Sequence, residues 1–163
     1  MIRSAVALLP LLAALWSAVA SAAPNCKPVV GSFQASVVPP GVGHCPNVAG
    51  AFCTAGRVWG GLQGDYQFVM NGAVSAAAPP LNGIATVLFF TGRSAVFLKS
   101  GATVYGTDTG SLDLPPGQGG FASLITFTDA AGAVTQGQIR LRGDFNPAEG
   151  TTSGDYLGTT CTP

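Results

Sequence analysis

Short apolar segments separated by glycine and proline recur along almost the whole chain, and this spacing limits what it can fold into. The 23 glycines and 12 prolines fall between these segments rather than in one tract, so they indicate turns between strands. The clearest example is residues 105–121, YGTDTGSLDLPPGQGGF, which predicts a strand, a Pro-Pro-Gly turn and the start of a return strand. No segment beyond the N-terminal region keeps a helical period. The chain is therefore expected to be all-β.

Eight segments carry this strand pattern. We expect strands at 29–38, 57–70, 84–91, 94–99, 102–114, 120–128, 133–144 and 152–160. Most connections between them are short, which favours hairpins between sequential strands. Eight antiparallel strands joined in this way suit a closed up-and-down barrel, since closure leaves no exposed edge. A two-sheet β-sandwich is the alternative.

The N-terminal residues 1–22 have the features of a secretory signal peptide. Arg3 supplies a positive charge, an uncharged apolar run follows, and Ala20-Ser21-Ala22 fits the small-x-small cleavage rule. An uncleaved membrane anchor is the weaker interpretation, because the run is short and contains Pro10. We therefore expect residues 23–163 to form one exported domain, secreted or periplasmic, without a membrane span.

The charge balance of the predicted mature chain excludes some classes of partner. Removing Arg3 leaves six basic residues against seven acidic ones, and the basic residues form no patch in the sequence. Nucleic-acid binding and electrostatic membrane binding then lose their usual driving force. The sequence contains no motif for a cofactor or metal, so none is expected.

All four cysteines lie in the predicted mature chain, and an even number in an exported protein favours two disulfides. Their spacing does not match a zinc site. Of the three possible pairings we favour Cys45–Cys53, which clips a loop, with Cys26–Cys161, which ties the two ends. The second pair requires the first and last strands to be neighbours, as barrel closure would make them.

Period-two alternation assigns side chains to the two faces of the strands. In segment 57–70 one face carries Val58, Leu62, Tyr66, Phe68 and Met70, and the other carries Arg57, Trp59, Gln63, Asp65 and Gln67. In segment 133–144 and just beyond it, one face carries Ile139, Leu141 and Phe145, and the other carries Gln136, Gln138, Arg140, Arg142 and Asp144. The apolar face is expected to line the lumen.

Asp108 is the charged residue of greatest interest, because alternation places it on the apolar face of its strand. A carboxyl group among apolar side chains has a raised pKa, which suits a general acid or base. Tyr66 and Tyr156 also have inward parity and are candidates to hydrogen-bond it, so the three form a candidate catalytic group in the lumen. A bulge at Gly106 or Gly110 would instead turn Asp108 toward water, and a structural carboxylate is the other alternative.

Two further features are weaker signals. His44 is the only histidine, and a lone loop histidine is more often solvated than catalytic; no G-x-S-x-G elbow accompanies it. Phe89 and Phe90 are adjacent, so one of them points outward and hints at a surface for a partner or for a homo-oligomer.

Several runs of residues resemble the allene oxide cyclase-like barrels, relatives of the dirigent proteins. The matching runs are GGLQGDY at 60–66, VLFFTG at 87–92, YGTDTGSLDL at 105–114, GGFASL at 119–124 and GDYLGTTC at 154–161. They cover nearly all of the predicted mature chain, in order. The resemblance implies an eight-stranded, calycin-like barrel. It leaves the activity open, because we can place no catalytic set of these families on this chain.

The leading expectation for function is a non-catalytic exported barrel that holds a small hydrophobic ligand or packs against a protein partner. One alternative is a cyclase or isomerase acting on a hydrophobic substrate in the lumen, with Asp108 as acid or base. A further alternative is a structural, envelope-associated protein with a filled core. A cavity of a few hundred cubic ångströms would favour the first two.

Overall fold

The structure, a computed structural model, describes residues 24–77, 85–114, 119–127 and 136–162. The predicted signal peptide at 1–22, and the predicted strand residues 84, 128 and 133–135, lie outside these ranges. Eight strands make up the fold: β1 (Asn25–Val38), β2 (Cys53–Gly60), β3 (Gly64–Ala77), β4 (Ala85–Leu98), β5 (Thr103–Asp113), β6 (Gly120–Phe127), β7 (Gln136–Asn146) and β8 (Thr151–Thr162).

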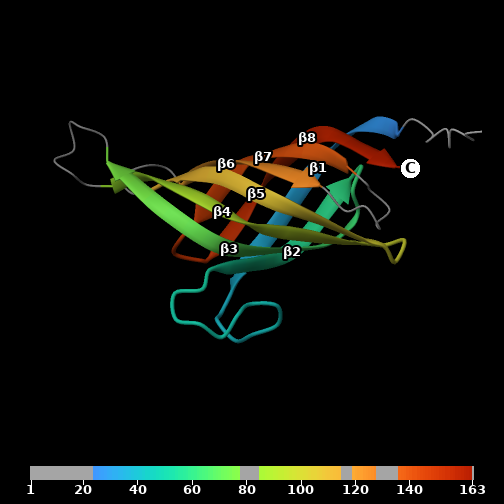
Figure 1. Cartoon of the computed structure of the whole chain (residues 1–163). Helices are drawn as coiled ribbons and strands as arrows, with labels where there is room; N and C mark the ends of the chain where they lie inside the picture. Colours follow the sequence, from blue (N-terminus) through green and yellow to red (C-terminus); the bar gives the residue numbers. More distant parts are fainter. Residues whose placement is uncertain (1–23, 78–84, 115–118, 128–135, 163) are drawn as a thin grey trace, which may run out of the picture.

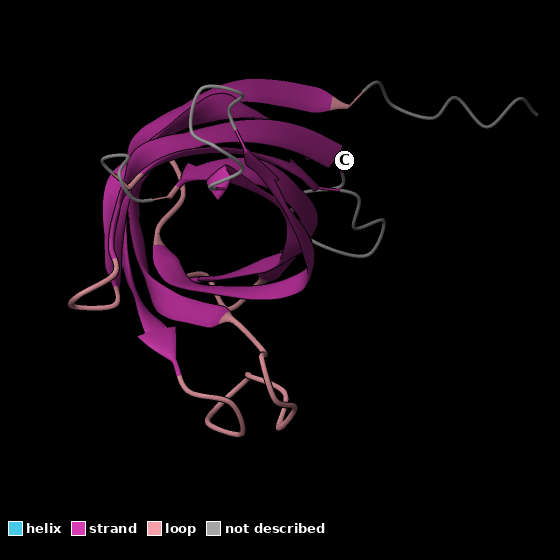
Figure 2. Ribbon diagram, turned by 90° about the vertical axis from the view of Figure 1, so that its left-hand side faces the viewer, coloured by secondary structure: helices cyan, strands magenta, loops and turns pink. Residues whose placement is uncertain are grey.

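The strands form a closed antiparallel barrel. Each strand pairs with the next in sequence, and β8 returns to pair with β1 (Figure 1). The view along the barrel shows the strands as a continuous ring (Figure 2). The closing seam is long, since it runs from Asn25 opposite Thr162 to Ser36 opposite Thr151. The predicted eight-stranded barrel is confirmed, and the sandwich alternative is wrong.

Both favoured disulfides are present. Cys26 lies directly opposite Cys161 across the seam between β1 and β8, and the two are bonded. Cys45 is bonded to Cys53, which joins the long loop after β1 to the first residue of β2. Two disulfides are compatible with an oxidising, extracellular compartment.

The predicted strand at 57–70 is wrong, because the structure has a hairpin there. β2 ends at Gly60, whose φ of +99° is a conformation that favours glycine, and β3 begins at Gly64. Leu62 lies in the turn and is buried. The Leu62 side chain points into the lumen, so the alternation of inward and outward residues continues through the turn. A period-two pattern therefore does not reveal this turn.

The two predicted strands at 84–91 and 94–99 are also wrong, because they are parts of one continuous strand, β4. Thr91-Gly92 resembles a turn but lies in the middle of the ladder, opposite Thr109 and Asp108. A Cβ atom at position 92 would collide with the Phe68 ring. Gly92 is therefore required for close packing rather than for a turn. The two errors cancel, which is why the predicted strand number is right.

The inner and outer faces follow the expected alternation. Side chains from all eight strands form one buried cluster inside the barrel. β4 contributes Val96 to it, and β8 contributes Tyr156. The basic and amide side chains of β7 are exposed, as predicted, and Trp59 on β2 is 43% exposed. The described part of the chain contains no helix long and apolar enough to cross a membrane.

Candidate functional site

The lumen has a packed half and a hollow half. The packed half lies near the turn between β2 and β3, where Leu62, Val58, Val29 and Tyr156 belong to the buried cluster. The hollow half is a cavity of about 270 Å³ toward the opposite end of the barrel. It is lined there by residues close to the strand ends, among them Leu112 of β5 and Thr152 of β8.

The cavity wall is mainly apolar and rich in aromatic rings. Seven rings contribute to it: Phe33, Phe52, Tyr66, Phe68, Phe90, Phe121 and Phe145. Six of them pack as three edge-to-face pairs with ring centroids 5.7 to 6.0 Å apart. Such pairs hold their rings in fixed orientations. Asp108 is the one charged residue among the described residues that line this cavity.

Asp108 lies on the lumen side of β5 and is only 2% exposed. The strand shows no register irregularity against β4 or β6, so the buried residues Val104, Gly106 and Asp108 follow one another by simple alternation. No bulge turns the carboxyl group outward. The chain thus places a carboxyl group deep in an aromatic cavity.

A hydrogen-bonded relay connects Tyr66 to this carboxyl group. Ser94 Oγ of β4 donates to Asp108 Oδ2 at 2.9 Å, and the Tyr66 hydroxyl lies 3.2 Å from Ser94 Oγ. A serine hydroxyl has one hydrogen, which Ser94 gives to Asp108, so Tyr66 must donate to Ser94. Sequence reasoning missed Ser94. Ser94 has the same inward parity as Val96, and this could have identified it. The predicted strand boundary at Gly92 concealed that parity.

Burial changes the protonation chemistry of both ends of the relay. It raises the pKa of Asp108 from 3.8 to about 6, and the Ser94 and Ser123 hydroxyls oppose this shift. Burial also raises the pKa of Tyr66 well above its usual value, and the nearby Asp108 carboxylate adds to the effect. Tyr66 is therefore a neutral hydrogen-bond donor at physiological pH, while Asp108 can gain or lose a proton close to neutrality.

Two buried side-chain polar atoms in the described part of the chain lack a hydrogen-bond partner, and both belong to residues that line the cavity. They are Asp108 Oδ1 and Thr152 Oγ1. Buried polar groups in native proteins are nearly always paired, because an unpaired one costs about 1–3 kcal/mol. The cavity thus contains two polar atoms without a hydrogen-bond partner, one on β5 and one near the start of β8.

Tyr156 does not join Asp108, contrary to the sequence-based expectation. Its inward parity is as expected, but it lies in the packed half. There its hydroxyl accepts a hydrogen bond from Leu62 N at 2.7 Å and directs its own hydrogen at Trp59 O and Leu62 O, at 2.9 and 3.1 Å. Tyr156 therefore fastens the turn between β2 and β3 to β8, and burial raises its pKa.

Replacing Tyr156 with Phe is expected to lower the free energy of unfolding by about 1–3 kcal/mol, because the buried Leu62 N–H loses its acceptor. Chemical denaturation of the wild type and the variant measures this loss. Tyr105, which is 55% exposed, supplies the matched control, and Tyr105→Phe should change stability by less than about 0.5 kcal/mol. Equal effects of the two variants would contradict the structural role of Tyr156.

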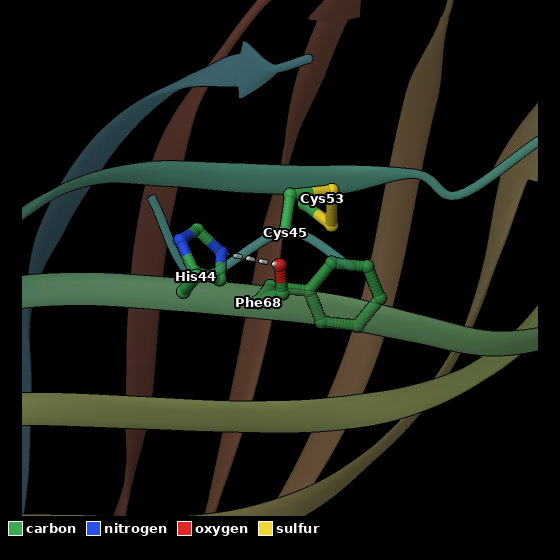
Figure 3. The surroundings of a disulfide bond; sticks show 4 residues. All are labelled: His44, Cys45, Cys53 and Phe68. Carbon is green, nitrogen blue, oxygen red and sulfur yellow. Dashed lines mark hydrogen bonds between the residues drawn. A yellow bond between two sulfur atoms is a disulfide. The ribbon is translucent and has the colours of Figure 1, made fainter. Parts of the chain in front are cut away.

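His44 is half-buried and bonded, which corrects the expectation of a solvated side chain. Its Nε2 lies 3.1 Å from the carbonyl oxygen of Phe68 and must carry the donated hydrogen (Figure 3). Next to it, the Cys45–Cys53 disulfide fixes the same loop to β2. His44 therefore anchors the loop against β3 and does not line the cavity.

The adjacent Phe89 and Phe90 point to opposite sides, as alternation requires. Phe90 lines the cavity, and Phe89 on the outer face is 53% exposed. A partner or homo-oligomer that covers Phe89 stays a prediction.

The chain matches no protein-family model, no curated protein and no solved structure. Function must therefore be argued from the cavity and its chemistry.

Proposed function

We propose that this barrel binds a small hydrophobic ligand in its aromatic cavity, with one polar group of the ligand held by Asp108. The observation that carries this proposal is the coincidence of the two unpaired buried polar atoms with one apolar cavity. A ligand that fills the cavity would supply both the missing hydrogen-bond partner and the missing apolar contacts. A structural protein with a filled core would need neither.

The cavity volume limits the ligand to a small molecule. At about 270 Å³ it lies just below the range of roughly 300–1,000 Å³ found for drug-sized ligands. It exceeds the engineered cavity of about 150 Å³ that holds benzene. One aromatic or aliphatic ring with a short polar side chain fits this space.

We also propose that the protein acts outside the cytoplasm, secreted or in a periplasm, as an allene oxide cyclase-like barrel. The signal-like segment at 1–22 and the two disulfides support export. The closed eight-stranded barrel is the fold that the family resemblance implies. Membership of that family stays a proposal.

Filling the cavity tests the ligand-binding function. Thr54 is 6% exposed and lines the cavity, so Thr54→Phe should displace ligand and weaken the binding of 2-phenylethanol at least about tenfold. Thr109 on β5 is exposed, and Thr109→Phe provides the same substitution outside the barrel. It should leave affinity unchanged within about twofold. Isothermal titration of the oxidised protein measures both affinities.

Two outcomes would count against the proposal. If the wild type binds no small aromatic molecule, whether neutral or cationic, the cavity is not a site for such ligands. If Thr54→Phe and Thr109→Phe bind 2-phenylethanol equally well, binding occurs outside the lumen. Circular dichroism of each variant shows whether the barrel has remained folded.

Proton transfer to or from a bound substrate is a second candidate function, as in a cyclase or isomerase. The raised pKa of Asp108, about 6, favours it, because a general acid or base works best when its pKa lies near the working pH. The relay from Tyr66 through Ser94 would steady the carboxyl group. Recovery of a chemically changed ligand from the wild type but not from Asp108→Asn would favour catalysis over binding alone.

A further inference from the structure

Among the residues that the structure describes, the carboxyl group in the cavity has no positively charged partner. The six basic side chains of the described ranges, Lys27, Arg57, Arg93, Lys99, Arg140 and Arg142, are all exposed. Arg57 pairs with Asp65 on the outer surface at 3.6 Å. A buried carboxylate is normally paired with a cation or fully hydrogen-bonded. Ser94 donates a hydrogen bond to Asp108 Oδ2, and hydrogen bonding by Ser94 and Ser123 lowers the pKa of the carboxyl group, but Asp108 Oδ1 has no hydrogen-bond partner.

We propose that the ligand of this cavity is a hydrophobic amine, whose ammonium group pairs with Asp108 and whose apolar body packs among the aromatic rings. This inference rests on the proposed ligand-binding function and specifies the ligand class. An ammonium group supplies both the missing positive charge and a hydrogen for Oδ1. A ligand carboxylate would place a second negative charge beside the ionised Asp108, so repulsion opposes its binding above about pH 6.

The wall of the cavity favours a cation as well. Tyr66, Phe68 and Phe90 line the same cavity as Asp108, and the faces of aromatic rings attract ammonium groups, more strongly when water is excluded. The carboxyl group has already lost its water in the folded protein. The desolvation cost of forming the ion pair therefore comes from the ammonium group of the ligand alone. Selectivity for a charged amine over a neutral isostere is the expected consequence.

A matched series of probes tests this inference on the oxidised protein. The probes are 2-phenylethylamine, 2-phenylethanol and phenylacetate, which share one ring and differ in the polar group. At pH 8 the amine should bind at least about tenfold more tightly than the alcohol, since a charge-assisted hydrogen bond is stronger than a neutral one. Phenylacetate should show no measurable binding. Isothermal titration gives all three values.

Removal of the charge provides the control. Asp108→Asn keeps the size of the side chain, so it should reduce the affinity for the amine at least about tenfold and leave the affinity for the alcohol within about threefold. Ser94→Ala keeps the carboxylate and should retain the preference for the amine. If Asp108→Asn fails to fold, the wild type itself supplies the readout through its pH dependence.

Affinity for the amine should fall as the pH decreases through about 6, where Asp108 takes up a proton, while the affinity for the alcohol stays constant. In the described part of the chain, Tyr66 of β3 is the one other titratable group of the cavity wall, and it stays neutral throughout this range. Equal affinity for amine and alcohol, or a preference that survives Asp108→Asn, would overturn the amine inference and leave the proposed function standing. Absence of binding by both probes would overturn both.

Discussion

Replacing Cys26 and Cys161 together by alanine is expected to lower the free energy of unfolding by about 5 kcal/mol, twice the effect of replacing Cys45 and Cys53. The two bonds close very different lengths of chain, with sequence separations of 135 and 8. A cross-link acts mainly by restricting the unfolded chain, and this restriction grows with the logarithm of the loop length, so the shorter loop is worth about 2.5 kcal/mol.

The native barrel should survive loss of the longer cross-link, because the seam of β1 and β8 keeps its backbone ladder. Urea unfolding of both double variants and the oxidised wild type measures the two losses. The double variants remove two cysteines each, so one controls for the other. Equal losses would show that the long cross-link does not act through the unfolded chain, and that native contacts of the cysteines dominate instead.

The fold was largely predictable because alternation identified the strand faces and the short connections indicated hairpins between sequential strands. The favoured Cys26–Cys161 pair required the first and last strands to be neighbours, and closure of the barrel makes them so. The errors arose where glycine serves packing or where an apolar side chain fills a turn. Gly92 makes room for the Phe68 ring within a strand, and Leu62 continues the inward pattern through a turn. Local composition does not distinguish a glycine within a strand from a glycine in a turn, or an apolar residue in a turn from one in a strand.

The site was only partly predictable, because alternation gives the direction of a side chain but not its height in the barrel. Asp108, Tyr66 and Tyr156 all have inward parity, yet the register of the strands brings only Tyr66 near Asp108. Tyr156 lies instead at the turn between β2 and β3, where its hydroxyl accepts a hydrogen bond from Leu62 N. The cavity itself depends on the summed volumes of side chains from all eight strands, which no single segment reveals.

Asp108→Asn is expected to remove the part of the pH dependence of stability that comes from the titration of Asp108. The pKa of Asp108 is about 6 in the folded protein, against a usual value of 3.8, so the native state keeps a proton that the unfolded chain has lost between these values. The contribution of Asp108 to native stability therefore falls as the pH rises from about 4 to about 6 and is level on either side. A shift of about two units corresponds to about 3 kcal/mol.

The asparagine variant cannot ionise, so its stability relative to the wild type should increase by about 3 kcal/mol between about pH 3 and pH 8. Comparing the two proteins at each pH cancels the titration of all other groups. Asp144→Asn on the exposed face of β7 is the matched control and should show no comparable trend. A constant difference between wild type and Asp108→Asn across this range would mean that Asp108 ionises as readily in the barrel as in water. The carboxyl group would then be hydrated in the cavity, and neither the unmet hydrogen bond at Oδ1 nor the preference for a cationic ligand would follow from its burial.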